Sequence, residues 1–175
     1  MCWQCLSRLG FQCHGWRKHS EFVMLTPNVR SVFNELIRLE TELWNAVDAR
    51  LRSELELPLS WYEPMNIMAT RECCRVQDIA GDLAITVGGA SKLVDRIEAV
   101  GFCRRRPNPA DGRSMIVELT PVGRGLLLRA HAVLDAELDR RMGAVLTGRV
   151  LGEFASTLLK LRAVSHTADA PCDVG

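Results

Sequence analysis

The sequence predicts a mainly α-helical protein that carries one small β-hairpin. Three observations support this prediction. Apolar residues recur at helical spacing through most of the chain. Two short strand-like runs enclose a cluster of turn-forming residues at positions 107–113. Apolar residues make up 47% of the sequence and charged residues 25%, which is the composition of a globular protein.

The length and the cysteine content limit the class of protein. A chain of 175 residues suits one domain of ordinary size, or a small domain with helical extensions. No apolar run approaches the length of about 18 residues that crosses a bilayer, and the N-terminus lacks the apolar segment of a signal peptide. We therefore expect a cytoplasmic protein with no membrane partner. Its seven cysteines are an odd number, which favours reduced thiols over a disulfide scaffold.

Residues 1–23 differ from the rest of the chain. They are rich in Cys, Trp and His, show no clean periodicity and precede Met24. We expect an N-terminal extension that is either disordered or a mis-assigned start. Its residues of metal-ligand type are Cys2, Cys5, Cys13, His14 and His19. Their spacing is irregular and lacks a second paired motif, so we predict no metal site and no cofactor.

Helical periodicity begins after this extension. Thr26-Pro27 has the pattern of an N-cap followed by proline at the first helical position, which predicts a long helix over residues 27–55, ended by Pro58. Ser60 and Glu63 have the spacing of a capping box, which predicts a second helix to about residue 70.

The next segments follow the same logic. Pro64 falls in the predicted first turn of the second helix, where a missing N–H is least harmful. A short third helix is predicted over residues 75–83. The fourth is predicted over residues 87–100, with Thr86 as its N-cap and Gly101 at its end.

A hairpin and two more helices complete the chain. Strands are predicted over residues 102–106 and 114–120, and the pair Asp111-Gly112 favours a hairpin turn between them. Further helices are predicted over residues 121–146 and 148–164, followed by a flexible tail at 165–175. Two closely spaced short helices followed by a hairpin indicate a winged helix-turn-helix fold, in which the hairpin is the wing.

The predicted fourth helix has an outward face suited to DNA. Ser91 and Lys92 can donate hydrogen bonds to base edges, and Arg96 can pair with a phosphate. Gly88 and Gly89 allow the backbone to approach DNA closely near the helix N-terminus. The alternative is the solvated face of an ordinary amphipathic helix.

The wing strengthens the DNA-binding interpretation. Residues 101–113 hold four arginines, at 104, 105, 106 and 113, against one acid. Alternate side chains on a strand face opposite sides, so at least one set of these arginines must be exposed. Arg113 is expected at the tip, where a long cation can reach a minor groove. The alternative is a charged edge strand that prevents aggregation.

Three segments resemble the signature of the multiple-antibiotic-resistance-regulator (MarR) family. They are LVDRIEAVGF at 93–102, RPNPADGR at 106–113 and VELTPVGR at 117–124. The family pattern is LVDRLE-x-x-G-L, then R-x-P-x-x-x-D-x-R, then V-x-L-T-x-x-G-R, and the helical layout extends the resemblance to about residues 27–163. The chain departs from the pattern at Gly112, where the family often has arginine, so one DNA contact is missing.

The resemblance implies a DNA-binding transcriptional regulator and not an enzyme. Family members are homodimers, joined here through helices at 27–55 and 121–164, which leaves 59–120 as the DNA-binding lobe of a domain spanning 24–164. They bind pseudo-palindromic operators in double-stranded DNA and usually repress. The wing residues carry over to Asp111 and Arg113. The predicted DNA-binding residues are Thr86, Gly88, Gly89, Ser91, Lys92, Arg96, Arg104, Arg106, Asp111 and Arg113.

The resemblance also implies an effector, which is a small, frequently aromatic ligand or, in some members, thiol oxidation. Trp44, Trp61 and Tyr62 lie near the position of the family's effector crevice, and their rings could stack on a flat ligand. The alternative, packing in the dimer core, is favoured. His131 is a lone histidine on a long helix, and we assign it no site.

Three cysteines are the alternative sensors. Cys103 lies on the first strand near the arginines, and neighbouring cations lower the pKa of a thiol and raise its reactivity. Cys73 and Cys74 are further redox candidates, and strain argues against a disulfide between these two neighbours. Buried, inert cysteine is the more common alternative. A winged helix could also act as a protein-interaction module without binding DNA.

Overall fold

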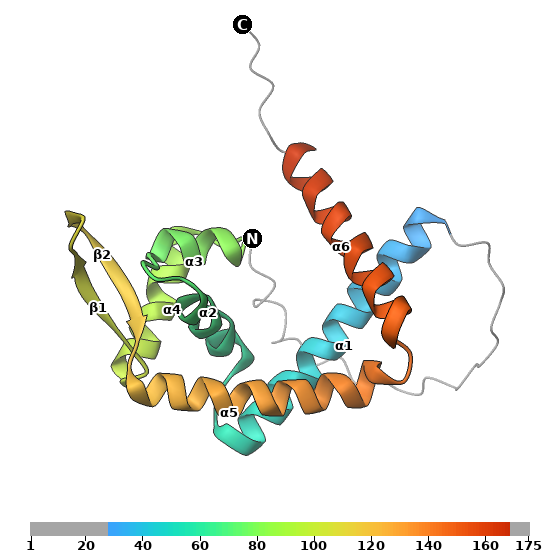
Figure 1. Ribbon diagram of the computed structural model, residues 1–175, viewed down its shortest axis with the longest axis horizontal. Coiled ribbons are helices and arrows are strands. Elements are labelled where there is room, and N and C mark those ends of the chain that lie inside the picture. Colours follow the sequence, from blue (N-terminus) through green and yellow to red (C-terminus); the bar gives the residue numbers. More distant parts are fainter. Residues whose placement is uncertain (1–27, 169–175) are drawn as a thin grey trace, which may run out of the picture. The chain divides into compact units, whose positions relative to one another are not determined.

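The computed structural model describes residues 28–168 and confirms a mainly helical fold with one antiparallel hairpin (Figure 1). The chain divides into two units between Glu35 and Leu36. Among the described residues, no helix is long and apolar enough to cross a membrane. The elements are α1 (Val29–Leu55), α2 (Leu59–Thr70), α3 (Val76–Asp82), α4 (Val87–Ala99), β1 (Cys103–Asn108), β2 (Asp111–Leu119), α5 (Pro121–Leu138), a π-helix (Asp139–Gly143) and α6 (Gly148–Ala168).

The first helix begins with a reciprocal cap. The backbone N–H of Ser31 donates to Asn28 Oδ1 (2.9 Å), and the N–H of Asn28 donates to Ser31 Oγ (3.1 Å). These bonds satisfy amide groups that have no partner within the helix. The predicted cap at Thr26-Pro27 lies outside the described residues.

The predicted capping box of α2 is wrong. The helix already begins at Leu59, with Pro58 at the N-cap position, so Ser60 lies inside the helix. The N–H of Leu59 donates to Asp48 Oδ1 on α1 (2.8 Å), which satisfies one of the first amide groups of the helix, all of which lack a partner within it. Pro64 lies in the helix interior and not in the first turn.

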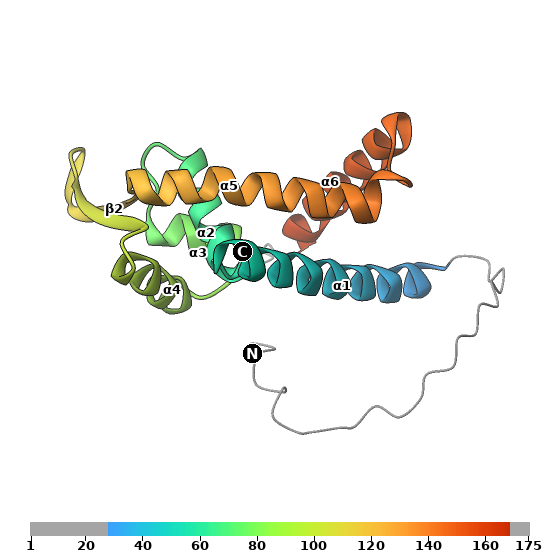
Figure 2. The ribbon, with the colours of Figure 1, turned by 90° about the horizontal axis from the view of Figure 1, so that it is seen from below.

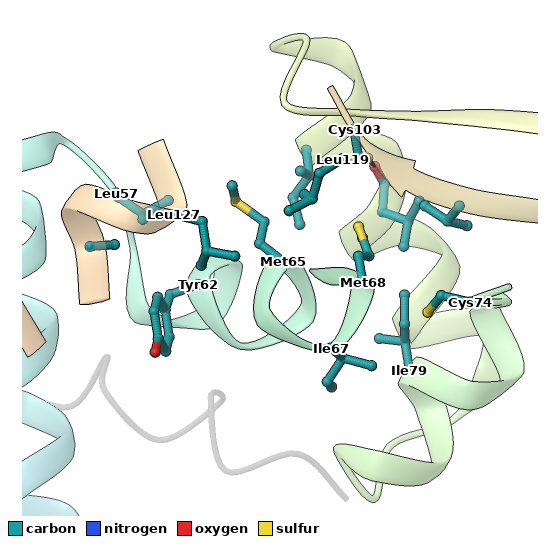
Figure 3. Close-up of a cluster of buried hydrophobic side chains, with 14 of the residues drawn as sticks. Leu57, Tyr62, Met65, Ile67, Met68, Cys74, Ile79, Cys103, Leu119 and Leu127 are labelled. Atoms are coloured by element: carbon teal, nitrogen blue, oxygen red, sulfur yellow. Dashed lines mark hydrogen bonds between the residues drawn. The ribbon is translucent and has the colours of Figure 1, made fainter. Parts of the chain in front are cut away.

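The helix α2 lies at the centre of the core. It packs against α3, α4, α5 and β2. Figure 3 shows Met65 and Met68 of α2 directed toward Leu119 of β2, while Leu127 of α5 lies on one side and Ile79 of α3 on the other. Burial of these side chains is the main source of stability of this lobe.

The helices α3 and α4 confirm the helix-turn-helix prediction. In both views of the ribbon they lie beside α2, next to the hairpin (Figures 1 and 2). Thr86 Oγ1 accepts a hydrogen bond from the N–H of Gly89 (3.1 Å), so Thr86 caps α4 as predicted. Gly101 follows the helix with a φ of +78°, a conformation that favours glycine.

The hairpin is longer than predicted and turns inside the predicted cluster at 107–113. Its ladder runs from Cys103 opposite Leu119 to Asn108 opposite Asp111, with an irregularity before the last pair. The turn therefore consists of residues 109–110, whereas the pair Asp111-Gly112 already belongs to β2. Asn108 Oδ1 accepts the N–H of Ala110 (3.0 Å), which stabilises the turn at this position. Residue 113 lies on β2 near the tip.

The helix predicted over residues 121–146 is interrupted. Regular α-helix ends at Leu138, and a π-helix follows over Asp139–Gly143. The carboxylate of Glu137 is buried and accepts hydrogen bonds from Arg140 Nη2 (2.6 Å) and Arg141 Nε (2.5 Å). These bonds, first that from Arg140, lower the pKa of Glu137 to about 2.

The last helix is also longer than predicted. Residues 165–168 continue α6, so the tail does not begin at residue 165. The remaining tail residues, 169–175, and the N-terminal extension at 1–23 lie outside the described residues.

The junction between the hairpin and α5 is tightly packed. Thr120 Oγ1 accepts the N–H of Gly123 (3.1 Å) and donates to the carbonyl of Gly101 (2.7 Å). The N–H of Thr120 donates to the carbonyl of Phe102 (3.0 Å). A Cβ atom at position 123 would lie 2.0 Å from that same carbonyl oxygen, so only glycine fits.

We predict that Gly123→Ala destabilises the protein by about 1–3 kcal/mol, because the Phe102 backbone must move. Gly125→Ala is the matched control on the same helix, since a Cβ atom there would meet no atom within 4 Å. Alanine at position 125 should stabilise the helix slightly. Urea unfolding followed by circular dichroism measures both changes, and equal shifts in the two variants would contradict the prediction.

Candidate nucleic-acid interface

The outward face of α4 is as the periodicity predicts. Ala90, Val94 and Ile97 are buried in the core. Lys92 and Arg96 are exposed. Thr86, Gly88 and Gly89 are also exposed, and Ser91 is half-buried. The structure therefore leaves the predicted DNA-binding residues of α4 wholly or partly open to solvent.

Packing within the chain does not require glycine at position 88. A Cβ atom there would meet no atom of the described chain within 4 Å, whereas one at position 89 would lie 3.2 Å from Thr86 Oγ1. The backbone of the first turn of α4 is therefore open at residue 88. Open backbone at a helix N-terminus allows close approach of a phosphate.

Arg104 and Arg106 lie on one face of the hairpin and share one acid. Arg104 Nε donates to Glu118 Oε1 (2.8 Å), and Arg106 Nε donates to Glu118 Oε2 (2.7 Å). Hydrogen bonds from Arg106 and then from Arg104 lower the pKa of Glu118. The two arginine side chains stay partly exposed, at 66% and 36%. This face of the wing therefore presents one excess positive charge.

Arg105 lies on the opposite face and points to α4. Its backbone N–H donates to Glu98 Oε1 (2.8 Å), Nη1 donates to Glu98 Oε2, and Nη2 donates to Asp95 Oδ1 (2.6 Å). Its side chain is only 22% exposed. Sequence reasoning missed this role, although two acids three residues apart on one helix share a face and could have indicated it.

Arg113 differs from the other three wing arginines. It is exposed, and no ion pair joins its guanidinium to an acid within residues 28–168. Asp111 Oδ1 instead accepts the backbone N–H of Arg113 (3.1 Å), so this acid shapes the strand near the tip. The charge of Arg113 is therefore available to a partner.

The prediction that arginines lower the pKa of Cys103 is wrong. Cys103 is 2% exposed, and burial, with a smaller contribution from Glu98, raises the pKa of its thiol to about 12. Burial likewise raises the pKa of Cys74 to about 11. Cys73 is exposed, and all three cysteines are free thiols. Because the thiolate is the reactive form, the environment of Cys103 suppresses its reactivity.

The three aromatic ligand candidates lie in different environments. Trp44 on α1 is 42% exposed, and Trp61 is half-buried against the core. Tyr62 is buried, with its ring edge-on to His131 at 5.7 Å. His131 Nε2 lies 3.1 Å from Asn66 Oδ1. Tyr62 and His131 thus join α2 to α5.

No cluster for a metal ion is found in the part of the chain that the structure describes. The metal-ligand-type residues of the extension lie outside that part.

Comparison with known proteins relates the helix-turn-helix and the hairpin to one family. The sequence model of the MarR family matches residues 63–115, which span the helix-turn-helix and most of the hairpin. The multiple antibiotic resistance protein MarR of Escherichia coli is 25% identical over 122 residues, covering 66% of this chain and 85% of that protein.

Solved structures share the fold. Sco3205, a MarR family transcriptional regulator from Streptomyces coelicolor solved in complex with DNA, has a TM-score of 0.69 at 23% identity, with 82% of this chain and 89% of that chain covered. CouR from Rhodococcus jostii, solved bound to p-coumaroyl-CoA, has a TM-score of 0.69 at 23% identity, with 74% and 90% covered. The family model and these relatives support a MarR family transcriptional regulator.

Proposed function

We propose that the protein is a sequence-specific repressor that binds a pseudo-palindromic operator as a homodimer and is released by a small ligand. One observation supports DNA binding: the exposed surface of α4 occurs together with Arg113 on the wing. No ion pair joins Arg113 to an acid within residues 28–168. In this fold α4 enters a major groove, and the wing reaches the adjacent minor groove. The proposed activity is binding and not catalysis.

Exposed apolar side chains on the long helices support the dimer. Exposed apolar surface of this kind marks an association surface, and a second copy of the chain would cover it. Examples are Phe33 and Ile37 on α1, Leu128 on α5, and Leu151 and Leu159 on α6.

An aromatic ligand is the proposed effector. CouR, which shares the fold, was solved with p-coumaroyl-CoA. In this chain Trp44 is exposed and Trp61 half-buried, so both can offer ring surface, whereas Tyr62 is buried. Screening aromatic acids for release of the bound operator tests this part of the proposal.

Fluorescence anisotropy tests the proposal directly. Duplexes that tile the region upstream of the gene are titrated with protein at two salt concentrations. Tight binding to one duplex that weakens steeply with salt is the expected result. Weak, uniform binding would mean that the target lies elsewhere, and no binding at either salt would favour a protein-interaction module.

We predict that Arg113→Ala weakens binding to all duplexes and reduces the magnitude of the salt slope by about 0.9 for one lost phosphate contact. Arg50→Ala is the control, because Arg50 is also exposed but pairs with Glu54 within α1. An unchanged slope in the Arg113 variant would exclude an electrostatic contact by the wing.

We predict that Leu159→Glu on α6 converts the dimer to a monomer, because a charge replaces an apolar side chain that is 65% exposed in the single chain. Thr157→Glu, two residues away and on the other side of the helix, should leave the dimer intact. Sedimentation equilibrium measures both. Retention of the dimer by the Leu159 variant would place the interface elsewhere.

The thiol-sensor alternative makes an opposite prediction for reactivity. Iodoacetamide should label exposed Cys73 in the native protein and leave Cys74 and Cys103 unlabelled until the protein unfolds, because burial keeps both as thiols. Mass spectrometry of the peptides measures the order. Rapid labelling of Cys103, together with peroxide release of DNA that Cys103→Ser abolishes, would favour the sensor.

A further inference from the structure

Arg105 is the wing arginine that joins two elements of the DNA-binding surface. It uses its backbone N–H and both terminal nitrogens of its guanidinium on two acids of α4, Glu98 and Asp95. A backbone bond and a two-pronged side-chain contact fix both the position and the direction of β1 at this point. The pair of Arg50 with Glu54, by contrast, lies within a single helix and fixes no such relation.

The position of Arg105 in the strand keeps its guanidinium from contacting a DNA phosphate. Arg104 and Arg106 face the other side of the hairpin, where both contact Glu118. Arg105 has a side chain that is mostly buried, and its terminal nitrogens are occupied by the two acids. A phosphate would have to displace two carboxylates to reach it.

The contact has a consequence for DNA recognition, on the condition that the proposed function holds. Residues of α4, such as Lys92, are assigned to one groove, and Arg113 on the wing is assigned to the next. Both contacts form together only when the wing and the helix keep a fixed relation, because a contact misplaced by an ångström loses most of its value. Arg105 supplies that relation, since it bridges α4 and β1 near the base of the hairpin.

We propose that Arg105 is a positioning residue that holds the wing at the spacing of two adjacent grooves, and thereby sets operator specificity without contacting DNA. Its partners Glu98 and Asp95 share this role. Their negative charges lie on the surface that meets DNA, where acids alone would weaken binding. The proposal therefore assigns to two acids a favourable effect on operator binding.

Glu98→Ala tests the sign of this effect in the full-length protein. Loss of a negative charge should strengthen binding to all DNA if charge alone matters. Loss of the Arg105 contact should instead weaken operator binding about tenfold, with much less change for an unrelated duplex of equal length. Equal or tighter operator binding by the folded variant would overturn the proposal. Thermal unfolding establishes that the variant is folded.

Arg105→Gln supplies the second test, in wild-type and Arg113→Ala backgrounds. The substitution should reduce the ratio of operator to unrelated-duplex affinity about tenfold in the wild type, and it should cost little once Arg113 is absent. Arg105→Lys keeps the charge but cannot bridge two acids, so it should not restore the ratio. Arg50→Gln, the matched loss of an arginine, should leave the ratio unchanged.

Each outcome separates the positioning role from the proposed function. A wild-type protein that binds every duplex equally, wherever the duplex is taken from, would end the proposed function. If the wild-type protein prefers the operator over an unrelated duplex, and the Arg105→Gln variant shows the same preference, the positioning role alone is overturned. The positioning role is also overturned if Arg105→Lys fully restores the affinity ratio, or if Arg105→Gln lowers the ratio equally with and without Arg113. Either result would mean that Arg105 acts only through its charge.

Discussion

One residue, Thr120, connects the end of α4, the hairpin and the start of α5. It donates to the carbonyl of Gly101 at the end of α4 and accepts from Gly123 in the first turn of α5, while the Thr120 backbone bonds Phe102 at the start of the hairpin. Thr120 therefore fixes both ends of the hairpin where they meet the helices. The bonds between Arg105 and α4 act on the same hairpin a few residues further along.

The fold could be predicted where its causes are local. Thr86 caps α4 through an amide three residues away, and Gly101 ends it through its own conformation, so sequence spacing reveals both. The start of α2 could not be predicted in this way, because its amide partner is Asp48, eleven residues away on another helix. The cluster at 107–113 predicts the place of the hairpin turn. It does not show that the Asp-Gly pair lies outside the turn, which the Asn108 side chain stabilises at residues 109–110.

Local sequence predicts one part of the candidate site and not the other. Periodicity alone separates Ala90 and Val94 from the outward face of α4, so that half of the site was predictable. Sequence could not tell which wing arginines face outward, because either side of a strand is open until its packing is known. The same missing information reversed the expectation for Cys103, where burial outweighs the neighbouring cation.

The net charge of the wing depends on acids that lie outside residues 101–113. Four arginines stand against one acid between residues 101 and 113, yet Glu118 on β2 and the acids Asp95 and Glu98 on α4 contact three of those arginines. With Asp111 included, four acids balance four arginines, and the local excess of charge disappears. What remains is a separation of charge: Arg113 lies near the tip without an ion pair to a described acid, whereas Asp95, Glu98 and Glu118 lie near the base.

The π-helix after α5 is a place where the chain can accept an inserted residue. A π turn holds about one residue more than an α turn, so it accommodates a single inserted residue without rotating the helix before it. Leu127 and Ala130 upstream stay in the core, while Glu137 and its two arginines stabilise the wider turn. Evolution can therefore add or remove one residue between Asp139 and Gly143 and redirect α6 while the DNA-binding lobe keeps its packing.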